Sequence, residues 1–132
     1  MTEKIYKTTE KHFEILKKEA KKWIKIFGLI GWDIRFIHRD LNDINVYANC
    51  NAKLDAHVAI ITLNTQWSEK ITNYNIKRTA FHEVCEVLFE RIDYIARARY
   101  INDGEIEDER HNLITILENI IFDEPQRQGK TI

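Results

Sequence analysis

A histidine and two glutamates are spaced along this chain as in a zinc-binding helix. The segment reads His82-Glu83-Val84-Cys85-Glu86. Residues four apart share one face of a helix, so His82 and Glu86 would point the same way and could bind one ion together. In the His-Glu-x-x-His helices of zinc enzymes, the outer residues bind zinc and the inner Glu is the base that acts on zinc-bound water. Here Glu86 replaces the second His, and a carboxylate oxygen is also an accepted zinc ligand.

A third ligand would have to come from another segment, because a catalytic zinc normally has three protein ligands and a water. The acidic stretch 105–111 offers His111, which would complete a set of two imidazoles and one carboxylate. Glu109 is the alternative, since its helical phase is closer to that of the apolar residues that follow it. We therefore predict Zn²⁺ bound by His82, Glu86 and His111, with Glu83 as the catalytic base and Glu109 left open as the third ligand.

The surrounding segments predict an α+β fold. Apolar residues recur at helical spacing over 8–27, 76–95 and 105–122, and the middle helix is apolar enough to be central. Strand-forming residues fill 32–39, 46–54 and 57–63, with short connections that favour an antiparallel meander. The prediction is an N-terminal helix, a three-stranded antiparallel sheet and two C-terminal helices that carry the metal site.

Length and composition limit the classes of protein. A chain of 132 residues predicts one domain, taken as residues 1–125 with a polar tail at 126–132. The net charge of −1 argues against a dedicated nucleic-acid binder. Two cysteines outside any CxxC pair, no signal-peptide pattern and no long apolar run predict a cytoplasmic protein that does not enter a membrane.

Four stretches, 31–37, 59–67, 80–89 and 107–122, together resemble small phage-encoded SprT-like metallopeptidase domains. They contain a Gly-Trp-x-Ile opening, an Ala-x-Ile-x-Leu-Asn-like strand, the His-Glu-x-x-Glu helix and an acidic final helix. The resemblance implies a zinc-dependent, peptidase-like fold with Glu83 as the base. Where the family commonly has a second His this chain has Glu86, and where the final helix often supplies a Glu it has His111.

A second function class stays open from the sequence. The same residues could form a catalytically silent metal-binding or protein-interaction domain, with a regulatory role. The first helix carries lysines opposite its apolar face, so an acidic partner could bind there. For a peptidase, the peptide or protein substrate is not specified by the sequence, and an oxyanion donor would come from Tyr94, Arg97, Arg99 or Tyr100.

Overall fold

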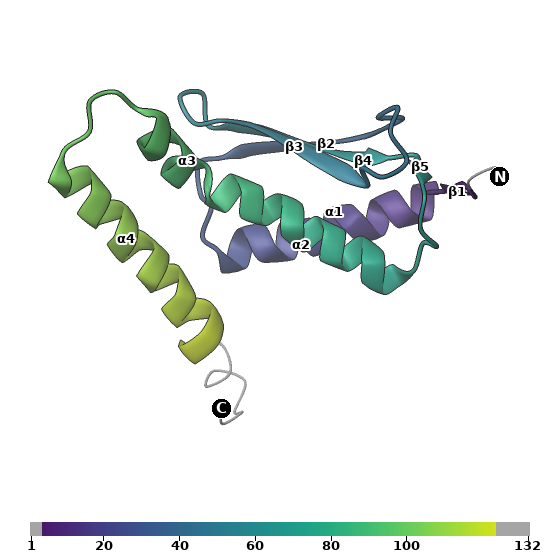
Figure 1. Ribbon diagram of the computed structural model, residues 1–132. Coiled ribbons are helices and arrows are strands. Elements are labelled where there is room, and N and C mark those ends of the chain that lie inside the picture. The colour runs from purple at the N-terminus through teal and green to yellow at the C-terminus, as the bar shows by residue number, and fades with distance from the viewer. Residues whose placement is uncertain (1–3, 124–132) are drawn as a thin grey trace.

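The computed structural model describes residues 4–123, so the predicted tail at 126–132 lies outside the described residues. The fold is α+β, as predicted (Figure 1). Its helices are α1 (Glu10–Ile26), α2 (Asn73–Leu88), α3 (Glu90–Arg97) and α4 (Asp103–Leu117), the last continued by a π-helical turn, η1 (Glu118–Asp123). Its strands are β1 (Tyr6–Lys7), β2 (Asp33–Arg39), β3 (Ala48–Lys53), β4 (Val58–Asn64) and β5 (Gln66–Trp67).

The main sheet has three strands, but the predicted antiparallel meander is wrong. The strand order is β2-β4-β3, in which β2 runs parallel to β4 and β3 runs antiparallel to it. After β2 the chain therefore skips the neighbouring position and forms β3 at the other edge of the sheet. It then turns back through the β3–β4 hairpin, and β4 fills the central position. The physical reason lies in β4, whose almost continuous run of apolar residues is buried and therefore takes the central position. Two-residue strands β1 and β5 form a separate antiparallel pair.

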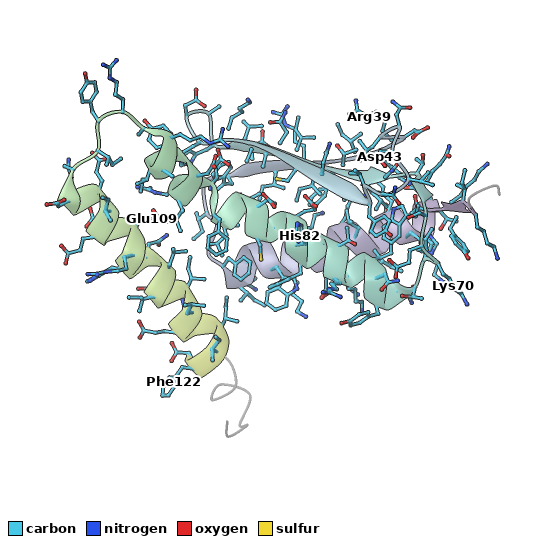
Figure 2. All side chains as sticks on the ribbon, in the orientation of Figure 1. Arg39, Asp43, Lys70, His82, Glu109 and Phe122 are labelled. Atoms are coloured by element: carbon cyan, nitrogen blue, oxygen red, sulfur yellow. The ribbon has the colours of Figure 1, made fainter. Side chains whose placement is uncertain are left out.

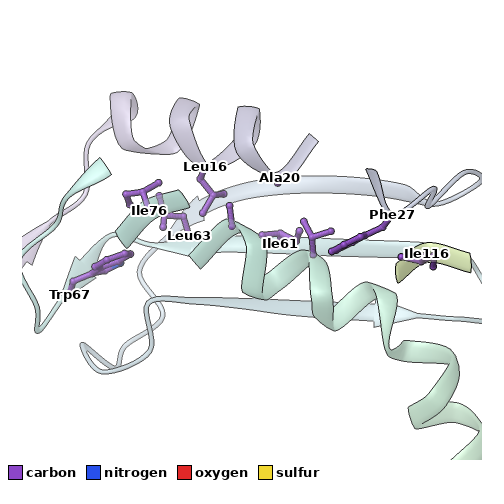
Figure 3. Close-up of a cluster of buried hydrophobic side chains, with 10 residues drawn as sticks. Leu16, Ala20, Phe27, Ile61, Leu63, Trp67, Ile76 and Ile116 are labelled. Carbon is purple, nitrogen blue, oxygen red and sulfur yellow. The ribbon is translucent and has the colours of Figure 1, made fainter. Parts of the chain in front are cut away.

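Helices α1 and α2 cover one face of the sheet (Figure 1). Thr9 caps α1, as its hydroxyl accepts the His12 N–H, and Gly28 with φ +67° follows the helix end. Leu16 on α1, Ile61 on β4 and Ile76 on α2 are fully buried in the shared core (Figure 3). This core holds α2 rigidly against the sheet, and α2 carries the candidate site.

The helix predicted over 76–95 is in fact two helices. Thr72, Asn73 and Asn75 are all residue types that favour a helix start, and α2 starts after Thr72, whose hydroxyl accepts the Asn75 N–H at 3.0 Å. The predicted helix is interrupted at Phe89, where α2 ends and α3 begins. No glycine, proline or side-chain cap marks this break, so local sequence gives no signal for it.

The last helix packs less closely than its sequence predicts. Five apolar residues were expected to face inward: Leu113, Ile116, Leu117, Ile120 and Ile121. Of these only Ile116 is buried, while Leu117 and Ile121 are more than half exposed. Figure 1 shows α4 extending away from the sheet, while Ile116 of α4 joins the buried core cluster. Across residues 4–123, no helix combines the length and apolar character needed to cross a membrane.

Candidate metal site on helix α2

His82 and Glu86 lie side by side on α2, one helical turn apart. Their nearest polar atoms, His82 Nε2 and Glu86 Oε1, are 3.5 Å apart, and both side chains are more than half exposed. Figure 2 shows His82 near the middle of α2. The pair has the donor types that zinc accepts, and its separation also suits an ordinary i,i+4 contact worth a few tenths of a kcal/mol.

Glu83, the predicted base, is the buried member of the motif. Its side chain turns inward from α2 and is only 6% exposed. Burial, with a smaller contribution from the negative charge of Glu86, raises the pKa of Glu83 to about 7. A carboxyl group with this pKa can both accept and release a proton near neutral pH, which is the property required of a general base.

A cleft of about 470 Å³ opens beside the motif, between α2 and the segment that leads into the outer strand β3. Asn75, Arg78, Thr79, His82 and Glu83 line it from α2, and the other wall consists of residues 45–48 with Trp67 and Glu69. The Tyr47 hydroxyl donates to Glu69 Oε2 at 3.1 Å, and the Tyr47 ring stacks on Trp67 with centroids 4.4 Å apart. The cleft therefore joins polar groups on the helix side to an aromatic wall on the sheet side.

The carboxylates of α2 also affect the opposing strand. Cys50 on β3 is half-buried, and burial together with the charges of Glu83, Glu86 and Glu90 raises the pKa of its thiol to about 12. Its thiol therefore stays protonated at neutral pH, and a neutral thiol is a poor metal ligand and nucleophile.

The structure does not bring the predicted third ligand to the other two. His111 is exposed on α4 and is not among the residues that line the cleft. Within residues 4–123, no three His, Cys, Asp or Glu side chains cluster closely enough to hold a metal ion. Among the described residues, the motif therefore offers zinc two adjacent donors, His82 and Glu86.

Glu109, the alternative third ligand, is engaged elsewhere. It is 3% exposed, and its Oε2 atom lies 2.5 Å from the Arg91 Nε atom of α3. Figure 2 shows Glu109 on α4, away from His82 on α2. The helical phase that favoured Glu109 indicated its burial correctly, but the buried side faces α3 and an arginine.

The Glu109–Arg91 pair gives a stability prediction for the α3–α4 contact. Arg91→Ala would leave a buried carboxylate whose other oxygen, Oε1, already has no hydrogen-bond partner. Because the Arg91 side chain is about half exposed and partly screened by water, we expect a loss of about 1–2 kcal/mol in the free energy of unfolding. Urea denaturation at pH 7 measures it, with Arg97→Ala as control, since Arg97 forms an exposed pair with Asp93. Equal losses in the two variants would contradict the prediction.

The suggested oxyanion donors do not reach the cleft. Tyr94, Arg97, Arg99 and Tyr100 line a separate hollow at the end of α3. Sequence reasoning instead missed Arg78, which contributes a guanidinium to the cleft wall. The signal was available, because Arg78 precedes His82 by the same four residues that separate His82 from Glu86.

The lysines predicted to face away from the core of α1 are exposed as expected: Lys11, Lys18, Lys21, Lys22 and Lys25. Lys22 lies 3.4 Å from Glu19 Oε1 on the same helix, and its ammonium lies over the Trp23 ring at 5.1 Å. These local contacts are typical of a solvated helix face.

Comparison with known proteins adds no family assignment: no family model, no curated protein and no solved structure matches this chain.

Proposed function

We propose that this chain is a zinc-binding, metallopeptidase-like domain whose site lies on α2 beside the cleft, which His82 and Glu83 line and Glu86 does not. The observation that carries the proposal is the placement of His82 and Glu86 together at the surface of α2, with the buried Glu83 between them in sequence. The resemblance of four sequence stretches to SprT-like domains agrees with this placement.

The donor set fits a zinc ion in part. His82 Nε2 and Glu86 Oε1 would be two protein ligands, while His111 enters the proposal as the third only if α4 changes its position. A zinc ion held there would polarise a peptide carbonyl and lower the pKa of a bound water. Glu83 would hold the proton that such a water releases, because its own pKa lies near 7.

The outer strand β3 provides a place for a peptide substrate. Among the described strands it pairs only with β4, so the other edge of its backbone is free. An extended peptide can add to such an edge through main-chain hydrogen bonds. Since Ala48 at the start of β3 lines the same cleft as His82 and Glu83, a peptide added here would pass beside them.

Metal content tests the proposal directly. We expect near one zinc per chain in tag-free protein after zinc reconstitution, measured by elemental mass spectrometry, and loss of that zinc in His82→Ala and in Glu86→Ala. Glu107→Ala, an exposed carboxylate on α4, is the matched control and should keep the metal. No zinc in the parent protein would contradict the proposal, and unchanged zinc in His111→Ala would remove His111 from the ligand set.

A second candidate is the silent interaction domain, and the surface of α4 favours it. Ile106, Ile114, Leu117, Ile121 and Phe122 are each close to half exposed or more, which is unusual for so many large apolar side chains on one helical segment. Hydrolysis of a fluorogenic peptide library separates the two candidates. We expect turnover by the zinc-loaded parent and none by Glu83→Gln, whereas a zinc-loaded parent without turnover would favour the interaction domain.

A further inference from the structure

Arg78 is a cation in the cleft that has no acidic partner among residues 4–123. It lies on α2 four residues before His82, so the two side chains project from the same face, with Cβ atoms about 5–6 Å apart. Arg78 is exposed and lines the cleft beside Thr79 and His82. Among residues 4–123, the ion pairs of the structure do not include its guanidinium.

The other groups of the cleft leave Arg78 free for a ligand. The nearest candidate acid on the opposite wall, Glu69, accepts a hydrogen bond from the Tyr47 hydroxyl at 3.1 Å. The wall also presents the apolar side chain of Val46, while Trp67, although it borders the cleft, is fully buried. A ligand in this cleft would therefore meet a positive charge at one end of the helix face and apolar surface across from it.

We propose that Arg78 selects ligands that carry an oxyanion group, a carboxylate or a phosphate, about one helical turn from His82 and two from Glu86. A guanidinium suits this task because its planar donors bind carboxylate and phosphate in a two-pronged manner that lysine does not reproduce. This inference rests on the proposed function, because it names the substrate class of the proposed peptidase: peptides with an acidic or phosphorylated side chain. The binding step itself needs no metal.

Three capped heptapeptides that differ only at the central residue test the inference: Glu, Gln and phosphoserine. Binding is followed in chelator by NMR, using the Trp67 indole N–H, which donates to the Tyr47 carbonyl at 3.1 Å beside the cleft. We expect the Glu or the phosphoserine peptide to bind parent protein at least about tenfold more tightly than the Gln peptide, as a charge-assisted pair of hydrogen bonds provides. The two anionic peptides then distinguish carboxylate from phosphate recognition.

Arg78→Ala is expected to abolish the preference for the anionic peptides, and Arg78→Lys to retain only part of it. Lys77→Ala is the matched control, because Lys77 is an exposed cation on the same helix that does not line the cleft, and it should keep the full preference. Preference retained in Arg78→Ala, or no preference or binding in the parent, would overturn the inference. Because these titrations need no zinc, an absence of peptide preference would not contradict the proposed metal site. Likewise, an absence of zinc binding would not contradict the proposed role of Arg78.

Discussion

Replacing Asn64 with alanine is expected to lower the free energy of unfolding by about 4 kcal/mol. Asn64 is fully buried at the end of β4, and its side-chain amide is satisfied on both sides. Its Oδ1 atom accepts the Leu41 N–H at 3.0 Å and the Gln66 N–H at 3.3 Å. Its Nδ2 group donates to the carbonyls of Asp43 at 2.9 Å and Val46 at 2.6 Å.

The size of the effect follows from what the substitution leaves behind. Four backbone groups would lose their partner, each worth about 1 kcal/mol, and those that remain buried would keep their desolvation cost. Urea denaturation at pH 7 measures the change, and Asn51→Ala on the exposed side of β3 is the matched control, expected within about 0.5 kcal/mol of the parent. A loss below 1 kcal/mol in Asn64→Ala would show that these bonds do not hold the loop.

The side-chain amide of Asn64 also affects the candidate site. Residues 45–48, which line the cleft, follow directly on the loop that Asn64 holds. Loss of those bonds would release the wall opposite His82 and Glu83. The Asn64 amide therefore contributes to the position of that wall, together with the Trp67 indole N–H, which donates to the Tyr47 carbonyl.

The second large effect is a pH-dependent gain in stability in Glu83→Gln. Burial raises the pKa of Glu83 from its ordinary 4.5 to about 7 in the folded protein. The folded chain therefore binds a proton more tightly than the unfolded chain, and the stability of the parent relative to the variant falls as the pH rises from 4.5 through 7. Above pH 7 the difference in the free energy of unfolding between the two proteins reaches a plateau of about 3 kcal/mol, with the glutamine variant the more stable.

Urea denaturation of metal-free protein in chelator, at pH 4.5 and pH 8.5, measures this difference. We expect the parent and Glu83→Gln to agree within about 0.5 kcal/mol at pH 4.5 and to differ by about 3 kcal/mol at pH 8.5. Glu107→Gln, on the exposed face of α4, should show little pH dependence relative to the parent. An equal difference at both pH values would contradict the raised pKa.

A gain in stability in Glu83→Gln would also be evidence that Glu83 has a functional role. Desolvated carboxylates are costly, and natural proteins retain such residues mainly at functional sites. Together with the zinc and peptide-hydrolysis measurements, this test would show whether Glu83 is kept for its chemistry at the expense of the fold.

Helices α1 and α2 each begin after a threonine, a residue type that favours helix starts. The hydroxyls of Thr9 and Thr72 cap α1 and α2 because a residue at a helix start can satisfy backbone N–H groups two or three positions ahead. By contrast, the interruption at Phe89 carries no residue that breaks helices, so packing around α2 and α3 decides it.

The order of the strands in the main sheet also depends on packing that the local sequence does not indicate. The three main strands lie within about two residues of the predicted ranges, and the nearly continuous apolar run in β4 is typical of a buried strand. Their order was predicted wrongly, since short connections favour neighbouring strands while burial of β4 requires the centre of the sheet. In this chain burial of the apolar strand prevails over adjacency.

By itself, the sequence determined the part of the site that a single helix builds. His82 and Glu86 lie together because helical spacing fixes neighbours four residues apart, wherever the helix packs. The tertiary structure alone decided that Glu83 is buried, that Arg78 faces the cleft beside β3 and that Glu109 pairs with Arg91. It also decided that His111 stays apart, because contacts between distant segments depend on how whole faces pack, which residue spacing within one helix does not encode.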